Sequence, residues 1–202
     1  MIDAMILPVQ RRLMQGPAEM LAARGLRADH VTLAGFGIGL LAIPALAMGA
    51  YGLALGFILA NRLADGLDGA IARINGPTDR GAFLDIALDF LFYALVPLGF
   101  ALADPGNAMA ALVLVVAFVG TGSSFLAFAT IAAQRGLRAE AFPTKGIYYL
   151  GGLTEGAETI GFFVVVCLWP GLFVPLAYLF AAACAVTTFT RWLMGWRAFG
   201  RE

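Results

Sequence analysis

Long apolar segments alternate with short polar breaks along the chain after residue 30. Each segment has roughly the 20 apolar residues that a helix needs to cross the hydrocarbon core of a bilayer. The breaks are rich in Gly, Pro, Asn and Asp, which favour turns. The pattern therefore predicts six membrane-spanning helices, over residues 31–50, 53–73, 78–102, 108–134, 147–169 and 172–194.

The first 30 residues show a different pattern, in which apolar residues recur at helical spacing opposite polar ones. These apolar residues are Ile2, Met5, Ile6, Val9 and Leu13. Such spacing predicts an amphipathic helix that lies in the membrane interface and breaks at Gly16 and Pro17. We therefore expect three regions: an interfacial region (1–30), a six-helix domain (31–194) and a short cytosolic tail (195–202).

The composition supports lipid as the solvent of this chain. Of its 202 residues, 61% are hydrophobic and 13% are charged, and the mean hydropathy is +0.86. Ordinary soluble domains lie far from these values. The formal net charge is zero, which gives no electrostatic basis for binding nucleic acid. The fold class that follows is all-α, a polytopic membrane protein.

Two local signals predict how the helices begin and pack. Thr78 precedes an apolar segment and is followed by Asp79, as expected for a helix N-cap with an acid in the first turn. Gly35 and Gly39 are four residues apart in the first segment, a spacing that lets another helix approach closely. That neighbour could belong to the same subunit or to another one.

The Lys and Arg residues lie on one side of the predicted spans. They precede the first span, occupy the second and fourth loops and follow the last span, whereas the opposite loops have none. Because cytosolic loops of membrane proteins carry an excess of cations, both termini and these two loops are predicted to be cytosolic. The expected location is the inner (cytoplasmic) membrane, with the polar parts of the helices facing the cytosol.

Four aspartates lie inside the predicted second and third spans. Asp65 and Asp68 are three residues apart and Asp85 and Asp89 are four apart, so each pair projects from one helix face. All four lie roughly 10 Å from the cytosolic helix ends. Like charges in a low dielectric need a compensating cation, and carboxylates without nearby His or Cys favour Mg²⁺ or Mn²⁺.

The alternative is a static polar cluster in which Arg62, Arg73 and Arg80 neutralise the acids. The regular offsets of the acids on two adjacent helices are not required by such a cluster. Intramembrane carboxylates also occur along ion pathways, so an ion-coupled transporter is a further alternative. The acids gather toward one face of the membrane, which leaves no polar route across it.

The aspartates belong to one continuous pattern that runs through both helices. It reads Asp65-x-x-Asp68-Gly69-x-x-Ala72-Arg73, seven further residues, then Gly81-x-x-x-Asp85-x-x-x-Asp89. This pattern resembles the signature of the CDP-alcohol phosphatidyltransferases, which exchange CMP for an alcohol. The stretches 88–94, 120–125 and 148–156 are similar to a branch of bacterial inner-membrane members.

The resemblance implies a role for each motif residue. Gly69, Ala72 and Gly81 would leave room for the CDP part of the donor, since small residues let a ligand approach the backbone. Arg73 would bind phosphate oxygens. Asp65, Asp68 and Asp85 would hold the metal, and Asp89, also near the metal, would act as the general base. The family likeness also implies a homodimer.

The acceptor alcohol is left open by the sequence. Candidates for its binding site are Lys145, Glu155, Glu158 and Arg191, because they lie at the same cytosolic level. Cations suit a phosphorylated alcohol and glutamates suit an amino alcohol. The predicted reaction moves a phosphatidyl group from CDP-diacylglycerol to an alcohol and releases CMP; the alternative moves a phospho-alcohol from a CDP-choline-like or CDP-ethanolamine-like donor to diacylglycerol.

Overall fold

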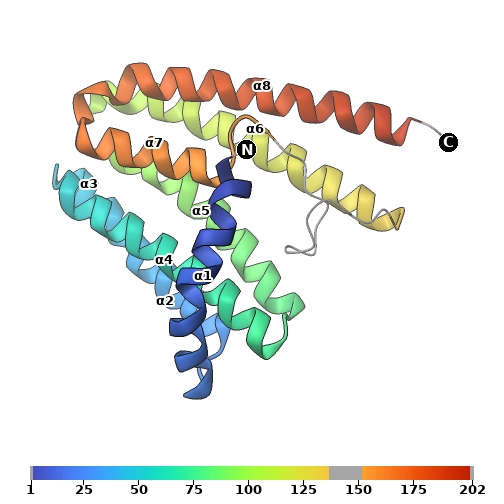
Figure 1. Cartoon of the computed structure of the whole chain (residues 1–202). Helices are drawn as coiled ribbons and strands as arrows, with labels where there is room; N and C mark the ends of the chain where they lie inside the picture. Colours follow the sequence, from blue (N-terminus) through green and yellow to red (C-terminus); the bar gives the residue numbers. More distant parts are fainter. Residues whose placement is uncertain (1, 137–151, 201–202) are drawn as a thin grey trace.

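The structure, a computed structural model, describes residues 2–136 and 152–200, and these ranges contain helices and no strand (Figure 1). Side chains are described from residue 12 onward. The helices are α1 (Ile2–Ala23), α2 (Ala28–Leu40), α3 (Ala42–Ala47), α4 (Tyr51–Asn75), α5 (Asp79–Ala103), α6 (Ala108–Gln134), α7 (Gly156–Leu168) and α8 (Phe173–Phe199). Short 3-10 turns, η1 (Pro105–Asn107) and η2 (Pro170–Leu172), precede α6 and α8.

Within the described ranges, four helical segments are long and apolar enough to cross a membrane. They are Ala28–Ala47, Asp79–Ala103, Pro105–Gln134 and Pro170–Phe199. Helix α4 has 25 residues but contains charged residues in its second half. Helix α7 has 13 residues, about 20 Å of helix. Each predicted span therefore overlaps a described helix, and four of the six are long and apolar enough to cross a membrane.

The predicted first span is divided into α2 and α3. Leu41 separates them, and its N–H donates to Ile38 O at 3.1 Å, three residues back. The cause is Pro44, which has no N–H to donate to Leu40 O, so the regular ladder is interrupted at this point. Leu41 keeps helical backbone angles, and the two pieces therefore continue as one segment.

Helix α7 begins later than the predicted fifth span. The prediction started the helix at residue 147, but residues 152–155 are not helical and α7 starts at Gly156. Glu155 is the N-cap and forms a capping box with Glu158, which satisfies the first backbone N–H groups and sets the start of the helix. The prediction was wrong here because an apolar pattern does not show where a cap interrupts it.

The predicted break at Gly16 and Pro17 in the N-terminal segment is also absent. Helix α1 continues through both residues. A proline removes one hydrogen bond of the ladder, and the helix is held beyond it because Ala18 is fully buried against Ala70 and Ile71 of α4. The side chains of Ile2, Met5, Ile6 and Val9 lie outside the described residues, so the predicted amphipathic face is not tested.

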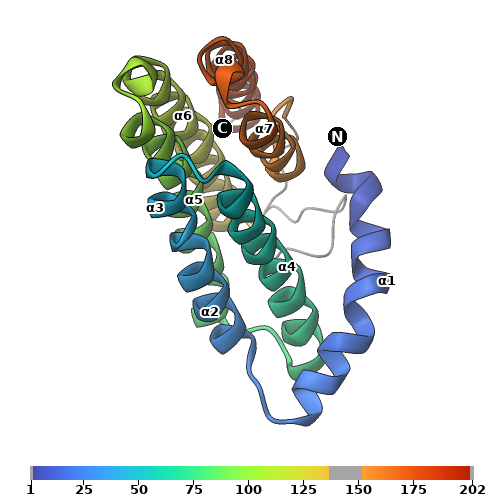
Figure 2. The same cartoon turned by 90° about the vertical axis from the view of Figure 1, so that its left-hand side faces the viewer.

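Helix α2 packs tightly against α4 and α5 through Gly35 and Gly39, two of its three glycines. A Cβ on Gly35 would overlap Ala64, and one on Gly39 would lie 2.9 Å from Phe92 Cε2 and 3.0 Å from Asn61 Cγ. The close approach predicted from the Gly35 and Gly39 spacing is thus confirmed, and it occurs within one chain. Figure 2 shows α2, α4 and α5 side by side, with α1 standing on the far side of α4.

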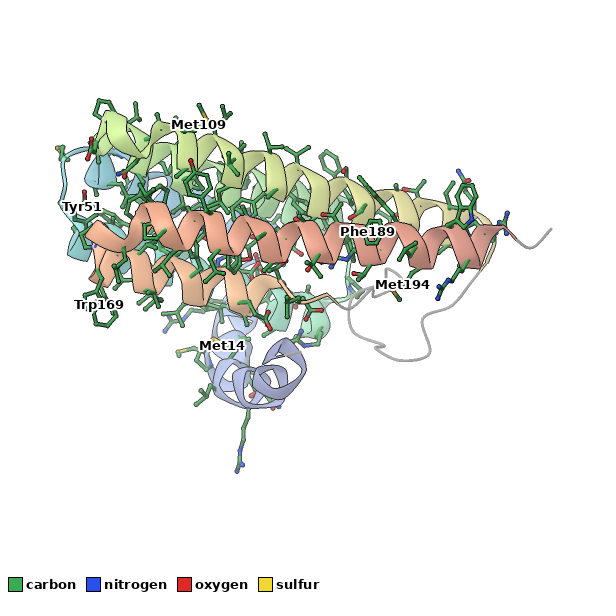
Figure 3. All side chains as sticks on the ribbon, turned by 90° about the horizontal axis from the view of Figure 1, so that it is seen from above. Met14, Tyr51, Met109, Trp169, Phe189 and Met194 are labelled. Atoms are coloured by element: carbon green, nitrogen blue, oxygen red, sulfur yellow. The ribbon has the colours of Figure 1, made fainter. Side chains whose placement is uncertain are left out.

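The main apolar core lies toward the end of the bundle formed by α3, the α5–α6 turn and the α7–α8 turn. Phe100 and Phe173 stack there with ring centroids 4.4 Å apart, and both are buried. Tyr51, Met109 and Trp169 lie at this same end, as Figure 3 shows. Helices α4, α6 and α8 therefore all start at this end and run toward the other.

Candidate active site

Helices α2, α4 and α5 together line a pocket that contains all four aspartates of the motif. Thr78 caps α5 by accepting from Gly81 N at 3.1 Å, as predicted, and this sets the register of α5. The lining residues are Thr32, Gly35 and Phe36 of α2, Asn61, Arg62, Asp65 and Asp68 of α4, and Asp85, Leu88 and Asp89 of α5.

Three of the aspartates bring carboxylate oxygens together. One oxygen each from Asp65, Asp68 and Asp85 lies within 4.8 Å of the others. Oxygen ligands of an octahedral Mg²⁺ stand about 3 Å apart when adjacent and about 4.2 Å apart when opposite, so small side-chain movements would bring the three oxygens onto one ion. Asp68 is buried and the other two are half-buried. The three carboxylates therefore fit a hard divalent cation.

Thr32 of α2 adds a hydroxyl to this carboxylate group. Its Oγ1 lies 2.5 Å from Asp68 Oδ2 and 3.1 Å from Ala28 O. The hydroxyl therefore links α2 to the Asp68 carboxylate of α4. No sequence pattern indicates this residue, because a threonine in an apolar helix commonly bonds to the carbonyl one turn earlier.

The fourth aspartate, Asp89, has a different partner. Arg62 Nη2 donates to Asp89 Oδ1 at 2.6 Å, and Arg62 Nη1 lies 3.8 Å from Asp65 Oδ2. Asp89 lines the same pocket but is not in the group of three oxygens described above. The structure thus brings Asp65, Asp68 and Asp85 together as predicted and places Asp89 beside an arginine.

The motif residues predicted to contact a nucleotide lie at the end of α4 and the start of α5. A Cβ on Gly69 would meet only Arg73 Nη1, at 3.7 Å, so Gly69 and Arg73 share a face that is otherwise open in the described structure. Ala72 is half-buried and Arg73 is exposed. A Cβ on Gly81, by contrast, would lie 3.1 Å from Asp29 Oδ1.

The three arginines of the static-cluster alternative have different neighbours. Arg80 pairs with Asp29 at the start of α2, away from the four aspartates. Arg62 contacts Asp89 and Asp65. Arg73 lies along Gly69. Arg62 therefore neutralises part of the acidic cluster, whereas Arg80 pairs with Asp29.

The acceptor-site candidates of the described residues lie around the segment before α7, where a Cβ on Gly152 would lie 3.2 Å from Arg191 Nη2. Arg191 of α8 is 8% exposed, donates from Nη1 to Thr121 O at 3.0 Å and lies over the Phe125 ring. Glu155 Oε1 accepts from Gly152 N at 2.7 Å, and Glu158 Oε2 accepts from Glu155 N at 3.2 Å. Lys145 lies outside the described residues.

A polar contact that the sequence did not reveal joins the segment before α7 to α8. Thr187 is fully buried, and its Oγ1 accepts from Leu153 N at 3.1 Å and Thr154 N at 3.2 Å. The Thr154 hydroxyl lies 3.0 Å from the same oxygen. Threonine is common in membrane helices and no motif surrounds Thr187, so these hydrogen bonds could not be predicted from the sequence.

Comparisons with known proteins agree on the family that the motif resembles. Residues 26–196 match the sequence model of the CDP-alcohol phosphatidyltransferase family. The inner membrane protein YnjF of Escherichia coli is 53% identical over 192 residues, which cover 95% of this chain and 93% of that protein. These matches include the whole motif from Asp65 to Asp89.

Solved structures of a Mycobacterium tuberculosis phosphatidylinositol phosphate synthase, PgsA1, have a similar fold. The structure with CDP-DAG bound has a TM-score of 0.71 and 24% identity, over 92% of this chain and 94% of that one. The structure with manganese and citrate has a TM-score of 0.69 and 25% identity, over 91% of this chain and 88% of that one.

Proposed function

Because the chain belongs to the CDP-alcohol phosphatidyltransferase family, we propose that it moves a phosphatidyl group from CDP-diacylglycerol to an alcohol and releases CMP. It is a transferase, and it depends on a divalent metal as the family does. The observation that carries the proposal is the meeting of the Asp65, Asp68 and Asp85 carboxylates in a pocket between apolar helices. The donor is chosen by likeness to PgsA1, which binds CDP-DAG.

In this proposal the three carboxylates hold Mg²⁺ or Mn²⁺. When bound, the ion neutralises charge on the donor's diphosphate and on the departing CMP. Asp89 takes the proton of the acceptor hydroxyl while the acceptor oxygen forms a bond to the lipid-linked phosphorus. The phosphoanhydride bond breaks and its electron pair leaves with CMP. Gly69, Ala72, Arg73 and Gly81 would hold the CDP moiety.

We place this site on the cytosolic side of the inner membrane. Helices α4, α6 and α8 start at the end of the bundle marked by Tyr51, Met109 and Trp169 (Figure 3). The turns at that end contain no Lys or Arg, whereas the helix ends on the other side do. The positive-inside tendency then assigns the cation-bearing ends to the cytosol. YnjF is an inner membrane protein, which supports the membrane assigned here.

The proposal also includes six crossings. Helix α4 has 25 residues, about 37 Å, and packs between α2 and α7. Arg62, Asp65 and Asp68 in its second half line the pocket. These charged side chains therefore need not contact lipid. Helix α7 is shorter. Residues 152–155 continue the chain from its start toward the cytosolic side, and they are held against α8 by hydrogen bonds to Thr187.

The activity test uses purified protein with Mn²⁺, CDP-diacylglycerol and acceptors of three chemical classes: polyols, phosphorylated alcohols and amino alcohols. We expect metal-dependent CMP release with one class and none after chelation by EDTA. Activity only with CDP-choline or CDP-ethanolamine plus diacylglycerol would contradict the proposed donor. No CMP release from any donor would contradict the reaction type. The productive class then tests whether Arg191 and Lys145, or Glu155 and Glu158, contact the acceptor.

A further inference from the structure

Arg62 lies outside the family motif, yet its guanidinium contacts the predicted general base. Its side chain is 13% exposed. Nη2 donates to Asp89 Oδ1 at 2.6 Å and Nη1 donates to the Tyr93 hydroxyl at 3.0 Å. Asp89 and Tyr93 are four residues apart on α5, so they present neighbouring side chains to the same partner. Arg62 therefore joins α4 to α5 at the carboxylate of Asp89.

A second edge of the guanidinium, formed by Nε and Nη2, is held by Asn61. The Asn61 Oδ1 accepts from Arg62 Nε at 3.0 Å and from Nη2 at 2.6 Å. Asn61 Nδ2 donates to Gly35 O at 3.0 Å, which fixes the amide so that its oxygen faces the arginine. The arginine is thereby connected to the backbone of α2, and its position does not depend on Asp89 alone.

Aromatic rings further restrict the guanidinium. Its Cζ lies 5.3 Å from the Phe92 ring centroid and 5.2 Å from the Tyr93 centroid. Cation–π contact and a planar set of donors in two directions are properties of arginine that lysine does not reproduce. An arginine that only neutralised charge would not need hydrogen bonds to Asn61 and Tyr93 as well.

We infer that Arg62 is a positioning residue that holds the Asp89 carboxylate in place for proton transfer and apart from the metal group of Asp65, Asp68 and Asp85. The inference rests on the proposed function, since it assumes that Asp89 is the base. The charge-assisted bond to Oδ1 orients the carboxylate. The 3.8 Å contact of Arg62 Nη1 with Asp65 Oδ2 keeps the guanidinium between Asp89 and the group of three carboxylates.

The first test compares Arg62→Gln and Arg62→Lys with Arg135→Gln, which removes an exposed arginine at the end of α6. We expect kcat to fall on the order of 30-fold or more for Arg62→Gln and less for Arg62→Lys. The KM for CDP-diacylglycerol should stay within about threefold of the wild type, because Arg62 does not contact the proposed nucleotide site. Wild-type kcat in Arg62→Gln, or a donor KM that rises as much as kcat falls, would overturn the inference.

The second test needs no turnover and measures Mn²⁺ binding by electron paramagnetic resonance. The four proteins are wild type, Arg62→Gln, Asp89→Asn and the double variant. Arg62→Gln should tighten the Kd for Mn²⁺ about fivefold where Asp89 is present, because the released carboxylate reaches the ion, and less than about twofold where Asp89 is replaced. Equal changes in both backgrounds, or none, would show that Arg62 does not position Asp89.

The two tests separate this inference from the proposed function. If the wild type releases no CMP from any donor, the proposed function fails, and the Mn²⁺ cycle still decides whether Arg62 restrains Asp89. If the wild type is active and both tests show no coupling, only the inference fails. Thermal unfolding in detergent checks that the variants fold. If Arg62→Gln does not fold, Arg62→Lys replaces it in both tests.

Discussion

At the residue scale, the four aspartates differ in their surroundings although they share one motif. Asp68 is buried and next to the Thr32 hydroxyl, whereas Asp89 is held by Arg62. The Thr32 hydroxyl has one proton and two acceptors within reach, Asp68 Oδ2 and Ala28 O. It can therefore turn to Ala28 when Asp68 binds a cation, without losing a hydrogen bond.

Asp68→Asn should weaken Mn²⁺ binding at least about tenfold, because one of three anionic ligands becomes neutral. The Asn oxygen can still accept from Thr32, so the helix packing should persist. The matched control is Asp104→Asn, at the opposite end of the bundle, where the side chain accepts from Gly106 N and an amide oxygen can do the same. Titration of Mn²⁺ in detergent measures both; equal affinities for the two variants would contradict the assigned ligand.

Asp89→Asn should lower the rate of CMP release by about 10² to 10⁴ because the amide cannot take the acceptor's proton. The protein should remain folded, since an Asn oxygen can still accept from Arg62. CMP release and thermal unfolding are measured on the same sample. Full CMP release by a folded Asp89→Asn protein would refute the base assignment.

At the element scale, the site depends on how closely α2 approaches α4 and α5. Gly39 lies against Phe92 and Asn61, and Asn61 in turn holds Arg62. A methyl group added at Gly39 would therefore displace Asn61, and Asn61 would in turn displace Arg62 in the pocket. The glycines of this helix are not equivalent, since a Cβ on Gly37 would meet nothing within 4 Å.

Gly39→Ala should destabilise the protein by about 1–3 kcal/mol, because the new methyl group overpacks the contact with Phe92 and Asn61. Gly37→Ala is the control: the same substitution on the same helix, in open space, should leave stability unchanged or raise it by up to about 1 kcal/mol through helix propensity. Thermal unfolding in detergent reports the difference. A melting temperature equal in both variants would contradict the close contact.

The sequence predicted the helices well and their ends less well, for physical reasons visible in particular residues. Apolar length and turn residues predicted the segments that contain α2 to α8, and they predicted Thr78 as a cap because its side chain acts locally. The start of α7 was missed because the capping box at Glu155 lies within an apolar pattern. Helix spacing predicted which aspartates could meet, whereas the pairing of Asp89 with Arg62 depends on the rotation of α4 against α5.

At the scale of the whole molecule, the helices alternate in direction between an end with cations and an end without them. Thr32 and the aspartates lie in the halves of α2, α4 and α5 near the cation-bearing end. The core of stacked aromatic rings around Phe100 lies near the other end. The polar site and the apolar core are therefore separated along the bundle axis.

This arrangement predicts which residues a membrane-impermeant thiol reagent can reach in intact cells. With Cys167 and Cys184 replaced by Ala, Met48→Cys in the exposed turn after α3 should be labelled from outside. Asn75→Cys at the exposed end of α4 should be labelled only after the cells are opened. The reverse pattern would place the site on the periplasmic side and contradict the proposed orientation.

The packing of α1 has a consequence for where a minimal folded unit begins. The match to the family starts at residue 26, after α1 has ended. Ala18 nevertheless covers Ala70 and Ile71, the residues just before Ala72 and Arg73 of the motif. A protein shortened to the matched region would expose Ile71 beside the turn that we propose binds the nucleotide, so the folded unit is expected to begin before the family match.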